Sequence, residues 1–258
     1  MTGLNTQGRF AGVCKIVRFN LQFYVGSAVG LLLVAVLLLA RMLPRWLEVF
    51  VLCGAVAMGF WTLSSLLVSW YVYDCSGVTR WAWMPTQLLA VPRRWVNIHA
   101  GLDESTLALQ RLFPRSEGSV VDIYDPTEMT EPSIARARRM YPATEPFLIG
   151  KFDSLPLPDS DRDEVFLLFA AHEVRAPERR TKLLCETARV LRDGGQVVLV
   201  EHLRDWANFF AFGPGFLHFH SGRSWRQSIR DAGLRIERES NITPFVRCFV
   251  LRKAGACS

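Results

Sequence analysis

Two long uncharged stretches near the N-terminus are the clearest pattern of apolar positions in this chain. Neither Leu21–Ala40 nor Val49–Tyr73 contains an Asp, Glu, Lys or Arg. A helix of roughly 20 apolar residues spans the ~30 Å hydrocarbon core of a bilayer. Trp70 and Tyr71, at the end of the second stretch, are residue types that favour a membrane interface. The pattern therefore predicts two transmembrane helices within residues 21–73.

Two other structures carry apolar stretches, and both stay open as alternatives. The first stretch could be a secretory signal peptide, although its apolar run is longer than usual and no small-residue cleavage site precedes the second stretch. The second could be the core helix of a soluble domain, although such a helix rarely lacks charge over so many residues. A pair of membrane spans explains both stretches together.

The segment between the two stretches, RMLPRWLE, is short and contains Pro44, which interrupts a helix. The two helices are therefore expected to form an antiparallel hairpin. The turn carries Arg41 and Arg45, and the outer ends carry more positive residues: Arg9, Lys15, Arg18, Arg80, Arg93 and Arg94. Because positive residues favour the cytoplasmic side, we expect an integral membrane protein with both termini and its soluble domain in the cytoplasm.

Gly26 and Gly30 form a pair of small residues four positions apart in the first predicted span. Such a pair lets another helix approach closely. The approaching helix is either the second span or a helix of a neighbouring subunit, so a homo-oligomer formed through the transmembrane helices is an open expectation.

The pattern changes at about Arg80, where short apolar runs begin to alternate with amphipathic stretches. This alternation is typical of βαβ units around a parallel sheet. We expect buried strands at WVNI, SVVDIY, PFLI, EVFLLFAA and QVVLVEH, and helices at STLALQRLF, PSIARARRMY, ERRTKLLCETARVL and SWRQSIRDAG. The last runs, LRIERES and FVRCFVLRK, predict an antiparallel edge. The predicted fold class is α/β, a Rossmann-like doubly wound sheet with an antiparallel C-terminal strand, preceded by an α-helical transmembrane hairpin.

These patterns divide the chain into an N-terminal cytoplasmic tail (1–20), the transmembrane hairpin (21–73), a juxtamembrane linker (74–93) and an α/β domain (94–258). The net charge is +6, but the Arg residues are scattered and no basic-aromatic recognition motif is present. We therefore expect no nucleic-acid partner, and attribute the charge to contact with the anionic headgroups of the lipid bilayer.

Three stretches of the α/β domain, taken in order, carry a more specific signal. DSLPLPDSDRDEVFLLFAAHEV has a Leu-Pro pair and an acidic turn before an apolar strand, with a His after it. ARVLRDGGQVVLVEH turns at Gly194 and Gly195 into a strand, and SWRQSIRDAGLRI leads into the last two strands. Together these stretches resemble the class I S-adenosylmethionine-dependent methyltransferases, among them the ubiquinone and menaquinone methyltransferases. The resemblance covers roughly Arg94–Lys253 and implies that residues 94–258 are methyltransferase-like; another doubly wound α/β fold is the alternative.

The resemblance implies that the cofactor, S-adenosyl-L-methionine, binds where the first strands end. The family has an acidic residue and a G-x-G-x-G loop after its first strand, whereas this chain has WVNIHAGLDEST. Asn97 takes the place of the acid, and His99, Gly101 and Asp103 take the places of the three glycines. We predict that Asn97, His99 and Gly101 bind the cofactor through a divergent loop.

The second and third strands are followed by further candidates for cofactor binding. Asp122 and Asp125 are the acids that could accept hydrogen bonds from the ribose hydroxyls. Near the expected adenine position Lys151 replaces an acid, and Asp153 follows two residues later. The divergence has two explanations, an altered site for S-adenosylmethionine or a domain that has kept the fold and lost the cofactor; the retained polar residues favour the first.

Polar residues also follow the fourth and fifth strands, where the resemblance places the methyl acceptor: His172, Glu173, Arg175, Glu201, His202, Arg204 and Asp205. Methyl transfer needs a deprotonated, aligned nucleophile, and a His or Glu can act as the base. We predict His172, Glu201 and His202 as catalytic residues, with His172 or Glu201 as the base. Alternatively, these residues cap strand ends and pair with each other, as Glu201 could with Arg175.

The connection from Trp206 to Phe219 is rich in aromatic residues and glycine. It suits a lid or a membrane-facing wall of the acceptor site, although a buried core helix would share this composition. We predict substrate binding by Arg175, Arg204, Phe216, His218 and His220. Since no tight ligand spacing is present we expect no metal, with His218 and His220 as the weak candidates for one.

Three functional hypotheses follow from the sequence. The first is a membrane-anchored methyltransferase that acts on a lipophilic acceptor such as a quinone precursor, a lipid or a phenol. The second is a quinone-modifying enzyme of the rhodoquinone type, which resembles methyltransferases, departs from the usual glycine loop and uses S-adenosylmethionine differently. The third is a catalytically inactive methyltransferase-like protein that serves as a membrane scaffold or assembly factor.

Overall fold

The computed structural model describes residues 8–142 and 146–254. The chain forms two compact units, one made of residues up to Ser76 together with Trp206–Phe216, and the other of Gly77–Asp205 together with the chain from Leu217 onward. The chain therefore leaves the second unit after Asp205 and re-enters it at Leu217.

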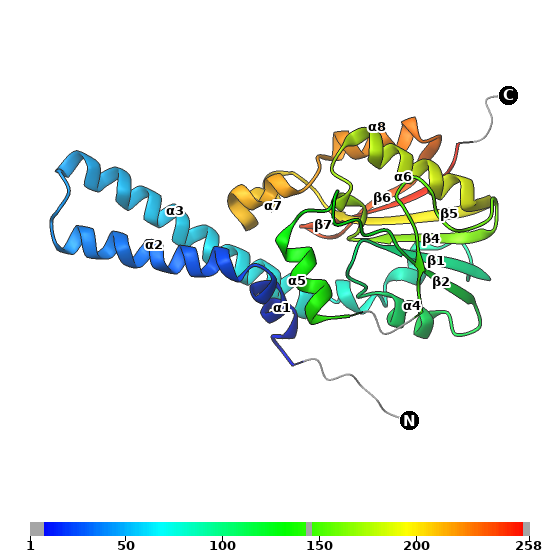
Figure 1. Cartoon of the computed structure of the whole chain (residues 1–258), viewed down its shortest axis with the longest axis horizontal. Coiled ribbons are helices and arrows are strands. Elements are labelled where there is room, and N and C mark those ends of the chain that lie inside the picture. The colour runs from blue at the N-terminus through cyan, green and yellow to red at the C-terminus, as the bar shows by residue number, and fades with distance from the viewer. Residues whose placement is uncertain (1–7, 143–145, 255–258) are drawn as a thin grey trace. The chain divides into compact units, whose positions relative to one another are not determined.

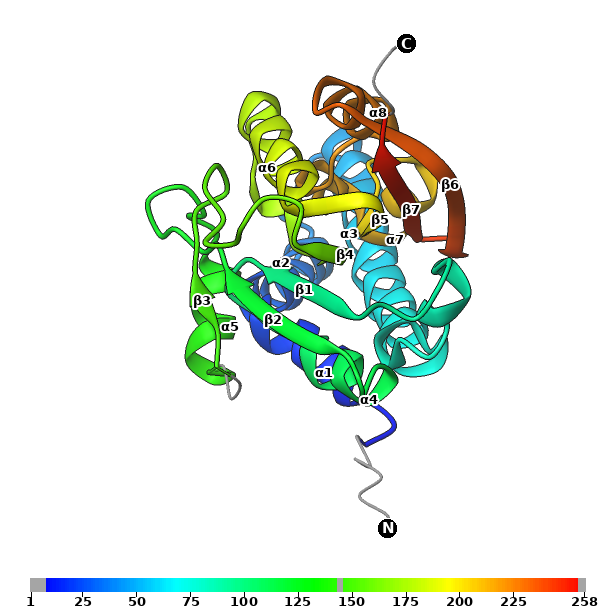
Figure 2. The same ribbon diagram turned by 90° about the vertical axis from the view of Figure 1, so that its right-hand side faces the viewer.

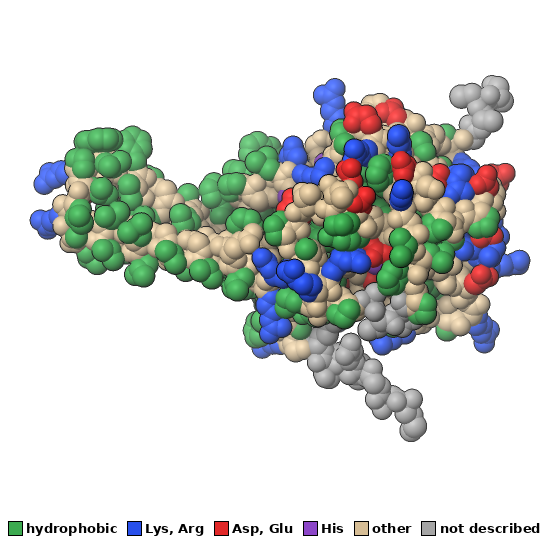
Figure 3. Space-filling model, in the orientation of Figure 1, with side chains coloured by type: hydrophobic (Ala, Val, Ile, Leu, Met, Phe, Trp, Pro, Cys, Tyr) green, Lys and Arg blue, Asp and Glu red, His purple; other side chains and the backbone are tan. Residues whose placement is uncertain are grey.

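The first unit contains the predicted helical hairpin. Its helices are α2 (Leu21–Leu39) and α3 (Arg45–Trp70), which contact each other and separate toward the turn that joins them (Figure 1). Both are long and apolar enough to cross a membrane, by length and composition. Figure 3 shows hydrophobic side chains covering the hairpin surface, as expected for helices that contact lipid. The hydroxyls of Tyr24 and Ser65 make a polar contact between the helices at 3.2 Å.

A helix that the sequence pattern did not predict, α1 (Ala11–Phe19), precedes the hairpin. Its N-terminus is capped by a residue far along the chain. The carboxylate of Asp74 accepts hydrogen bonds from the backbone N–H groups of Gly12 (2.7 Å) and Val13 (2.9 Å). An acid at this position satisfies two of the free donors of the first turn and is favoured by the helix dipole.

The second unit is built on a seven-stranded sheet with the order β3-β2-β1-β4-β5-β7-β6 (Figure 2). Its parallel strands are β1 (Arg94–His99), β2 (Glu117–Asp122), β3 (Leu148–Ile149), β4 (Arg162–Leu168) and β5 (Leu191–His202). The antiparallel edge consists of β6 (Leu234–Thr243) and β7 (Val246–Lys253). This architecture confirms the predicted fold class, including the antiparallel end of the sheet.

The helices of this unit are α4 (Thr106–Leu112), α5 (Pro132–Met140), α6 (Pro177–Val190) and α8 (Gly222–Asp231). Between them and the sheet lies a core in which the central residues of β4 and β5 are fully buried, as the apolar runs predicted. Two 3-10 helices, Val78–Arg80 and Met84–Gln87, occupy the predicted linker.

The glycine pair expected at a turn between helix and strand lies inside β5. The pairing with β4 is irregular here, because Arg162 is opposite Leu191 while Glu164 is opposite Gln196. Gly194 has a φ of +83° and open space around it, whereas a Cβ on Gly195 would lie 2.7 Å from the carbonyl oxygen of Asp163. The two glycines therefore serve different purposes, a left-handed backbone at one position and a close approach of two strands at the next.

This difference predicts unequal costs of substitution. We expect Gly195→Ala to lower the free energy of unfolding by about 1–3 kcal/mol, because the added methyl meets backbone that cannot move aside cheaply. Gly194→Asn should cost less than about 1 kcal/mol, since Asn tolerates the left-handed region. Thermal unfolding of the detergent-solubilised variants measures both effects. Equal shifts of the two unfolding midpoints would contradict this account.

Candidate active site

The loop after β1 is held by side-chain hydrogen bonds. The amide nitrogen of Asn97 donates to the hydroxyls of Ser105 (2.9 Å) and Thr106 (2.8 Å) and to the carboxylate of Asp103 (3.2 Å). Asp103 also accepts hydrogen bonds from the backbone N–H groups of Ser105 and Thr106. Asn97 is buried, so in this structure it fixes the shape of the loop that begins α4.

Asp122, the last residue of β2, is the centre of a second polar network. Its Oδ1 accepts hydrogen bonds from the backbone N–H groups of Gly101 (3.1 Å) and Tyr124 (2.9 Å). Its Oδ2 pairs with Arg138 of α5 at 2.5 Å, and the Arg138 guanidinium also lies over the ring of Tyr124. Asp122 is 5% exposed, so all of these partners surround a buried carboxylate.

Gly101 has a φ of +98°, and a Cβ there would meet Ile134, Tyr124 and Arg138 at 2.9–3.2 Å. Side chains of α5 and of the segment after β2 therefore occupy the space next to Gly101 that the absence of a Cβ leaves free. Arg138 is the movable part of this cover, because its side chain is 34% exposed.

His99, the last residue of β1, is buried, and neither ring nitrogen has a hydrogen-bond partner among the described residues. Its Nδ1 lies 3.6 Å from Oδ1 of Asp122. Burial lowers the pKa of His99 despite this carboxylate, so the imidazole is neutral at neutral pH. A buried imidazole without partners offers one donor and one acceptor to a bound ligand.

The three predicted acids are not equivalent. Asp125 is taken up locally, since its Oδ1 accepts hydrogen bonds from the backbone and hydroxyl of Thr127, and these bonds lower its pKa. Asp153 is exposed, in the turn bridged by Lys151 and Ser154. Of the three, Asp122 is the buried carboxylate at a strand end, where ribose hydroxyls would be recognised.

The residues at the ends of β1 and β2 have the chemical groups that could bind S-adenosylmethionine. Asp122 offers a carboxylate, Gly101 a backbone with a positive φ, and His99 an imidazole whose nitrogens make no hydrogen bond among the described residues. Arg138 holds the carboxylate oxygen that a ribose hydroxyl would use. Binding of the cofactor therefore requires the Arg138 side chain to turn away from Asp122.

The ends of β4 and β5 bring together the two side chains predicted as the base. His172 lies in a short 3-10 helix, Ala171–Glu173, after β4, and Glu201 is fully buried near the end of β5. The Nδ1 of His172 and Oε2 of Glu201 are 2.7 Å apart, and the backbone N–H of His172 donates to Oε1 at 3.1 Å. Glu201 therefore orients His172 rather than pairing with Arg175.

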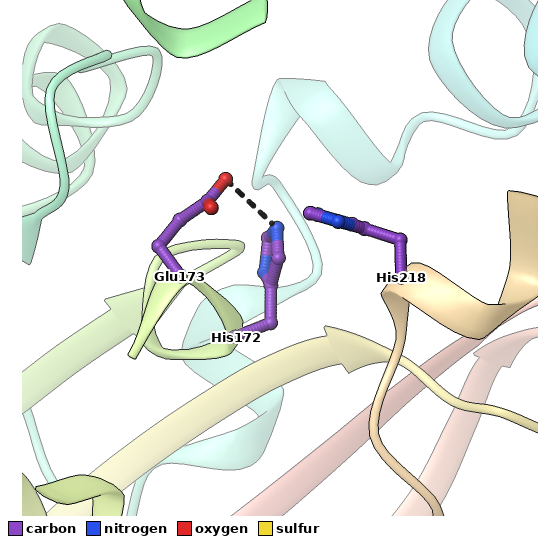
Figure 4. A group of neighbouring side chains, drawn as sticks. All are labelled: His172, Glu173 and His218. Atoms are coloured by element: carbon purple, nitrogen blue, oxygen red, sulfur yellow. Dashed lines mark ion pairs between the residues drawn. The ribbon is translucent and has the colours of Figure 1, made fainter. Parts of the chain in front are cut away.

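Glu173 and His218 complete this cluster (Figure 4). Oε1 of Glu173 lies 3.3 Å from Nε2 of His172, and its Oε2 is buried without a hydrogen-bond partner in the described part of the chain. The rings of His172 and His218 meet edge to face, with centroids 5.2 Å apart. Glu173 stands out in the sequence as a polar residue after the fourth strand, but no role was predicted for it.

The cluster separates the pKa values of its two histidines. Burial alone would lower the pKa of His172, but the carboxylates of Glu201 and Glu173 outweigh burial and raise it to about 10. Burial and the positive charge of His172 lower the pKa of His218 to about 4. At neutral pH, His172 therefore carries a proton and His218 does not.

Both predicted substrate-binding arginines hold the segment that carries His218. Arg175 donates to the carbonyl oxygen of His218. Arg204 donates to the carbonyl oxygens of Phe219 and Leu217, both at 2.8 Å. These arginines fix the backbone at one wall of the site, because both guanidinium groups donate hydrogen bonds to carbonyl oxygens of this segment.

The remaining predicted residues have different surroundings. His202 is stacked between Phe169 and Phe219, and its Nδ1 bonds the carbonyl oxygen of Phe245 at 2.8 Å. His220 is buried and its Nε2 contacts the carbonyl oxygen of His172 at 3.2 Å, while burial and Arg180 lower its pKa to about 3. Phe216 belongs to the first unit.

Two arginines near these residues were not predicted from the sequence. Arg138 is one of three arginines in α5, and nothing in the pattern PSIARARRMY distinguishes it from its neighbours. Arg180 is fully buried in α6, donates to Ser224 at 2.7 Å and lies over the ring of Trp225. An arginine on the inner face of an amphipathic helix is the only signal that could have indicated it.

His172, Glu173 and His218 also have the residue types of a metal site, with one ligand atom from each lying within 4.8 Å of the others. His218 is one of the two weak metal candidates predicted from the sequence, and His220 is not part of the group. A cation bound here would have to displace the proton of His172.

A small cavity of about 120 Å³ adjoins the cluster, lined in part by Glu173, Arg175, Met129 and Phe152. A larger one of about 430 Å³ lies between the start of α6 and the length of α8 and is lined mostly by polar residues. We assign the site to the smaller cavity because the titratable groups are there. Typical ligand pockets are about 300–1,000 Å³, so an acceptor must widen it.

Comparison with known proteins agrees with this geometry. Residues 106–199 match the family model of the methyltransferase domain. No curated protein matches the chain. An S-adenosylmethionine-dependent methyltransferase from Aquifex aeolicus is 16% identical, with a TM-score of 0.53 over 69% of this chain and 93% of its own.

Two further solved structures share the fold. The mitomycin 7-O-methyltransferase MmcR is 15% identical with a TM-score of 0.57, covering 98% of this chain and 76% of its own. The [4+2]-cyclase SpnF is 15% identical with a TM-score of 0.50, covering 70% of this chain and 81% of its own. At such identities likeness shows fold alone. With the family model, it supports the predicted class, an S-adenosylmethionine-dependent methyltransferase domain.

The His172–Glu201 pair predicts a pH dependence of stability. A pKa raised by folding, from about 6.5 to about 10, contributes stability that is present below pH 6.5 and lost as the pH rises toward 10. Glu201→Gln removes the strongest attraction for the proton, so we expect a flatter dependence of unfolding temperature between pH 7 and 10.

Glu239→Gln is the matched control, because Glu239 pairs with Arg226 and Arg247 and not with a histidine. This variant should keep the wild-type slope. A Glu201→Gln protein whose unfolding temperature falls between pH 7 and 10 as steeply as the wild type would show that Glu201 does not hold the proton.

Proposed function

We propose that this chain is a membrane-anchored methyltransferase that transfers a methyl group from S-adenosylmethionine to a lipophilic acceptor, such as a quinone precursor, a lipid or a phenol. The observation that carries the proposal is the oriented pair of His172 and Glu201 at the ends of β4 and β5. These ends lie at the same edge of the sheet as Asp122 and Gly101, because β1, β2, β4 and β5 are parallel.

In this mechanism His172 is the base. Asp122, Gly101 and His99 would hold S-adenosylmethionine at the ends of β1 and β2, where it would supply an electrophilic methyl group. Nε2 of the unprotonated His172 would take the proton of the acceptor hydroxyl, so that the hydroxyl oxygen could accept the methyl group while the bond from that group to the sulfonium sulfur breaks and S-adenosylhomocysteine leaves. Glu201 keeps the ring oriented through Nδ1 and stabilises the imidazolium that results.

The proposed membrane anchor would hold the α/β domain close to acceptors that are dissolved in the bilayer. The hairpin, with more positive residues at its outer ends than at its turn, favours a cytoplasmic domain beside the bilayer.

Gly30 of α2 faces Met58 of α3, since a Cβ on Gly30 would lie 3.5 Å from the Met58 side chain, whereas Gly26 has open space. The open face at Gly26 leaves room for a helix of a second subunit. The name of MmcR, an O-methyltransferase, is consistent with a hydroxyl acceptor.

Two other functions fit parts of the structure. The divergent loop, with His99 and Arg138 where the cofactor would approach, favours a rhodoquinone-type enzyme that uses S-adenosylmethionine differently. A loop whose cofactor position is occupied by His99 and Arg138 would also suit a scaffold that binds no cofactor. Both alternatives predict that no acceptor gains a methyl group.

The direct test uses the full chain in lipid nanodiscs with S-adenosylmethionine labelled in its methyl group and quinone, phenol and lipid acceptors, with and without divalent metal. Mass spectrometry should find acceptors heavier by one methylene unit, with the label incorporated. An exchange of substituents without label would favour the rhodoquinone-type reaction. No product and no binding by calorimetry would favour the scaffold.

Cofactor binding should respond in opposite directions to two substitutions. Asp122→Asn should weaken S-adenosylmethionine binding by about tenfold or more, because the charged acceptor for the ribose hydroxyls is lost. Arg138→Gln should tighten binding several-fold, since the group that competes for Asp122 is removed. Calorimetric titration measures both. Weaker binding in Arg138→Gln would show that Arg138 holds the cofactor instead of blocking it.

The rate should rise with pH if His172 is the base. Because its pKa is raised to about 10, only a small unprotonated fraction acts at neutral pH, and kcat/KM should increase about tenfold per pH unit below that value. Glu201→Gln should move the inflection to lower pH. A wild-type inflection near pH 6.5 would contradict the assignment of His172 as base.

A further inference from the structure

The segment Trp206–Phe216 leaves the α/β unit and packs on the hairpin. Its helix α7 (Trp206–Phe212) lies alongside α3 (Figure 1). The ring of Phe209 meets that of Trp61 at 5.4 Å, and the hydroxyl of Ser64 donates to the carbonyl oxygen of Phe210 at 2.9 Å. These contacts add α7 to the unit that contains α1 and the hairpin.

The segment Trp206–Phe216 approaches α3 closely, and the contact between them is apolar. A Cβ on Gly213, just after α7, would lie 2.7 Å from the ring of Trp61. Phe209 also meets Phe216 at 5.1 Å, so the segment folds back on itself over α3. The packing fixes the level along α3 at which α7 lies, between Trp61 and Ser64.

The other face of α7 is apolar and uncovered. Trp206 is 76% exposed and Phe210 is 56% exposed. No charged residue occurs from Trp206 to Leu217. Exposed Trp and Phe side chains on a short uncharged helix are costly in water and suit the boundary between lipid headgroups and acyl chains.

The level of α7 along α3 agrees with such a boundary. Nineteen residues separate Arg45, at the turn, from Ser64, which is about 28 Å at 1.5 Å per residue. The hydrocarbon core is about 30 Å thick. With Arg45 at the far surface, Ser64 therefore lies close to the near surface. The contact of Ser65 with Tyr24, near the start of α2, marks the same level on the other helix.

We propose that Trp206–Phe216 is a third membrane element, an interfacial helix that inserts Trp206 and Phe210 into the leaflet at which both ends of the hairpin emerge. Lipid is the occupant because α7 packs on α3 beside Trp61 and Ser64, where the neighbouring apolar side chains of Phe60, Leu63 and Leu67 are also exposed. The inference rests on the proposed function in one respect, that the hairpin spans a bilayer.

The proposed membrane segment lies close to the acceptor site along the chain. His218, in the catalytic cluster, follows Phe216 by two residues, and the intervening carbonyl oxygen of Leu217 is held by Arg204. The membrane-inserted segment therefore continues directly into a wall of the site.

The test measures depth with a fluorescent label on a single cysteine, in the full chain with its native cysteines replaced by serine, reconstituted in nanodiscs. Labels are placed through Trp206→Cys or Phe210→Cys. Val36→Cys, on the exposed surface of α2, is the hydrocarbon control, and Lys182→Cys, exposed on α6, is the water control. Lipids with a nitroxide at the top or near the end of the acyl chain serve as quenchers.

We expect labels at positions 206 and 210 to be quenched most by the shallow nitroxide, the label at 36 by the deep one, and the label at 182 by neither. Labels at 206 and 210 that behave like 182, while 36 is quenched, would overturn the interfacial helix and leave the anchor intact. Absence of quenching at 36 would instead refute the anchor, and the interfacial helix with it.

Discussion

The carboxylate of Glu201 has no exposed surface, and a negative charge in that position requires compensation from nearby groups. His172 provides it, through its ring and its backbone N–H. Once His172 is fixed and protonated, Glu173 is attracted to its other nitrogen, and burial together with the charge of His172 keeps His218 neutral. One buried charge at the end of β5 thus sets the orientation and protonation of His172 and contributes to the neutral state of His218.

The same logic governs the cofactor side of the sheet. Asp122 is buried at the end of β2 and is satisfied by two backbone N–H groups and Arg138. The difference is that Arg138 reaches the carboxylate from a partly exposed position and can leave it. A buried acid with a removable partner can exchange that partner for a ligand, whereas Glu201, enclosed on all sides, holds its partner permanently.

The sequence allowed the strands and helices of the second unit and its antiparallel edge to be predicted, because each strand is a short apolar run that alternates with an amphipathic helix. His172 and Glu201 could be predicted as neighbours because parallel strands end at one edge. The partners of Asp122 and the clamps on Leu217–Phe219 could not, since they depend on which arginine of an amphipathic helix or loop turns inward. Nor did the apolar pattern of Trp206–Phe216 show that it packs on α3 rather than on the sheet.

The discontinuous make-up of the first unit has a practical consequence for isolating the enzyme. Removing residues up to Ser76 would take away α3 and leave the aromatic side chains of Trp206–Phe216 without the helix against which they pack. Such a shortened chain would expose the apolar side chains of this loop to water and would tend to aggregate. A version without the hairpin would need that loop shortened or replaced with polar residues at the same time, so the hairpin and the α/β domain are not separable modules.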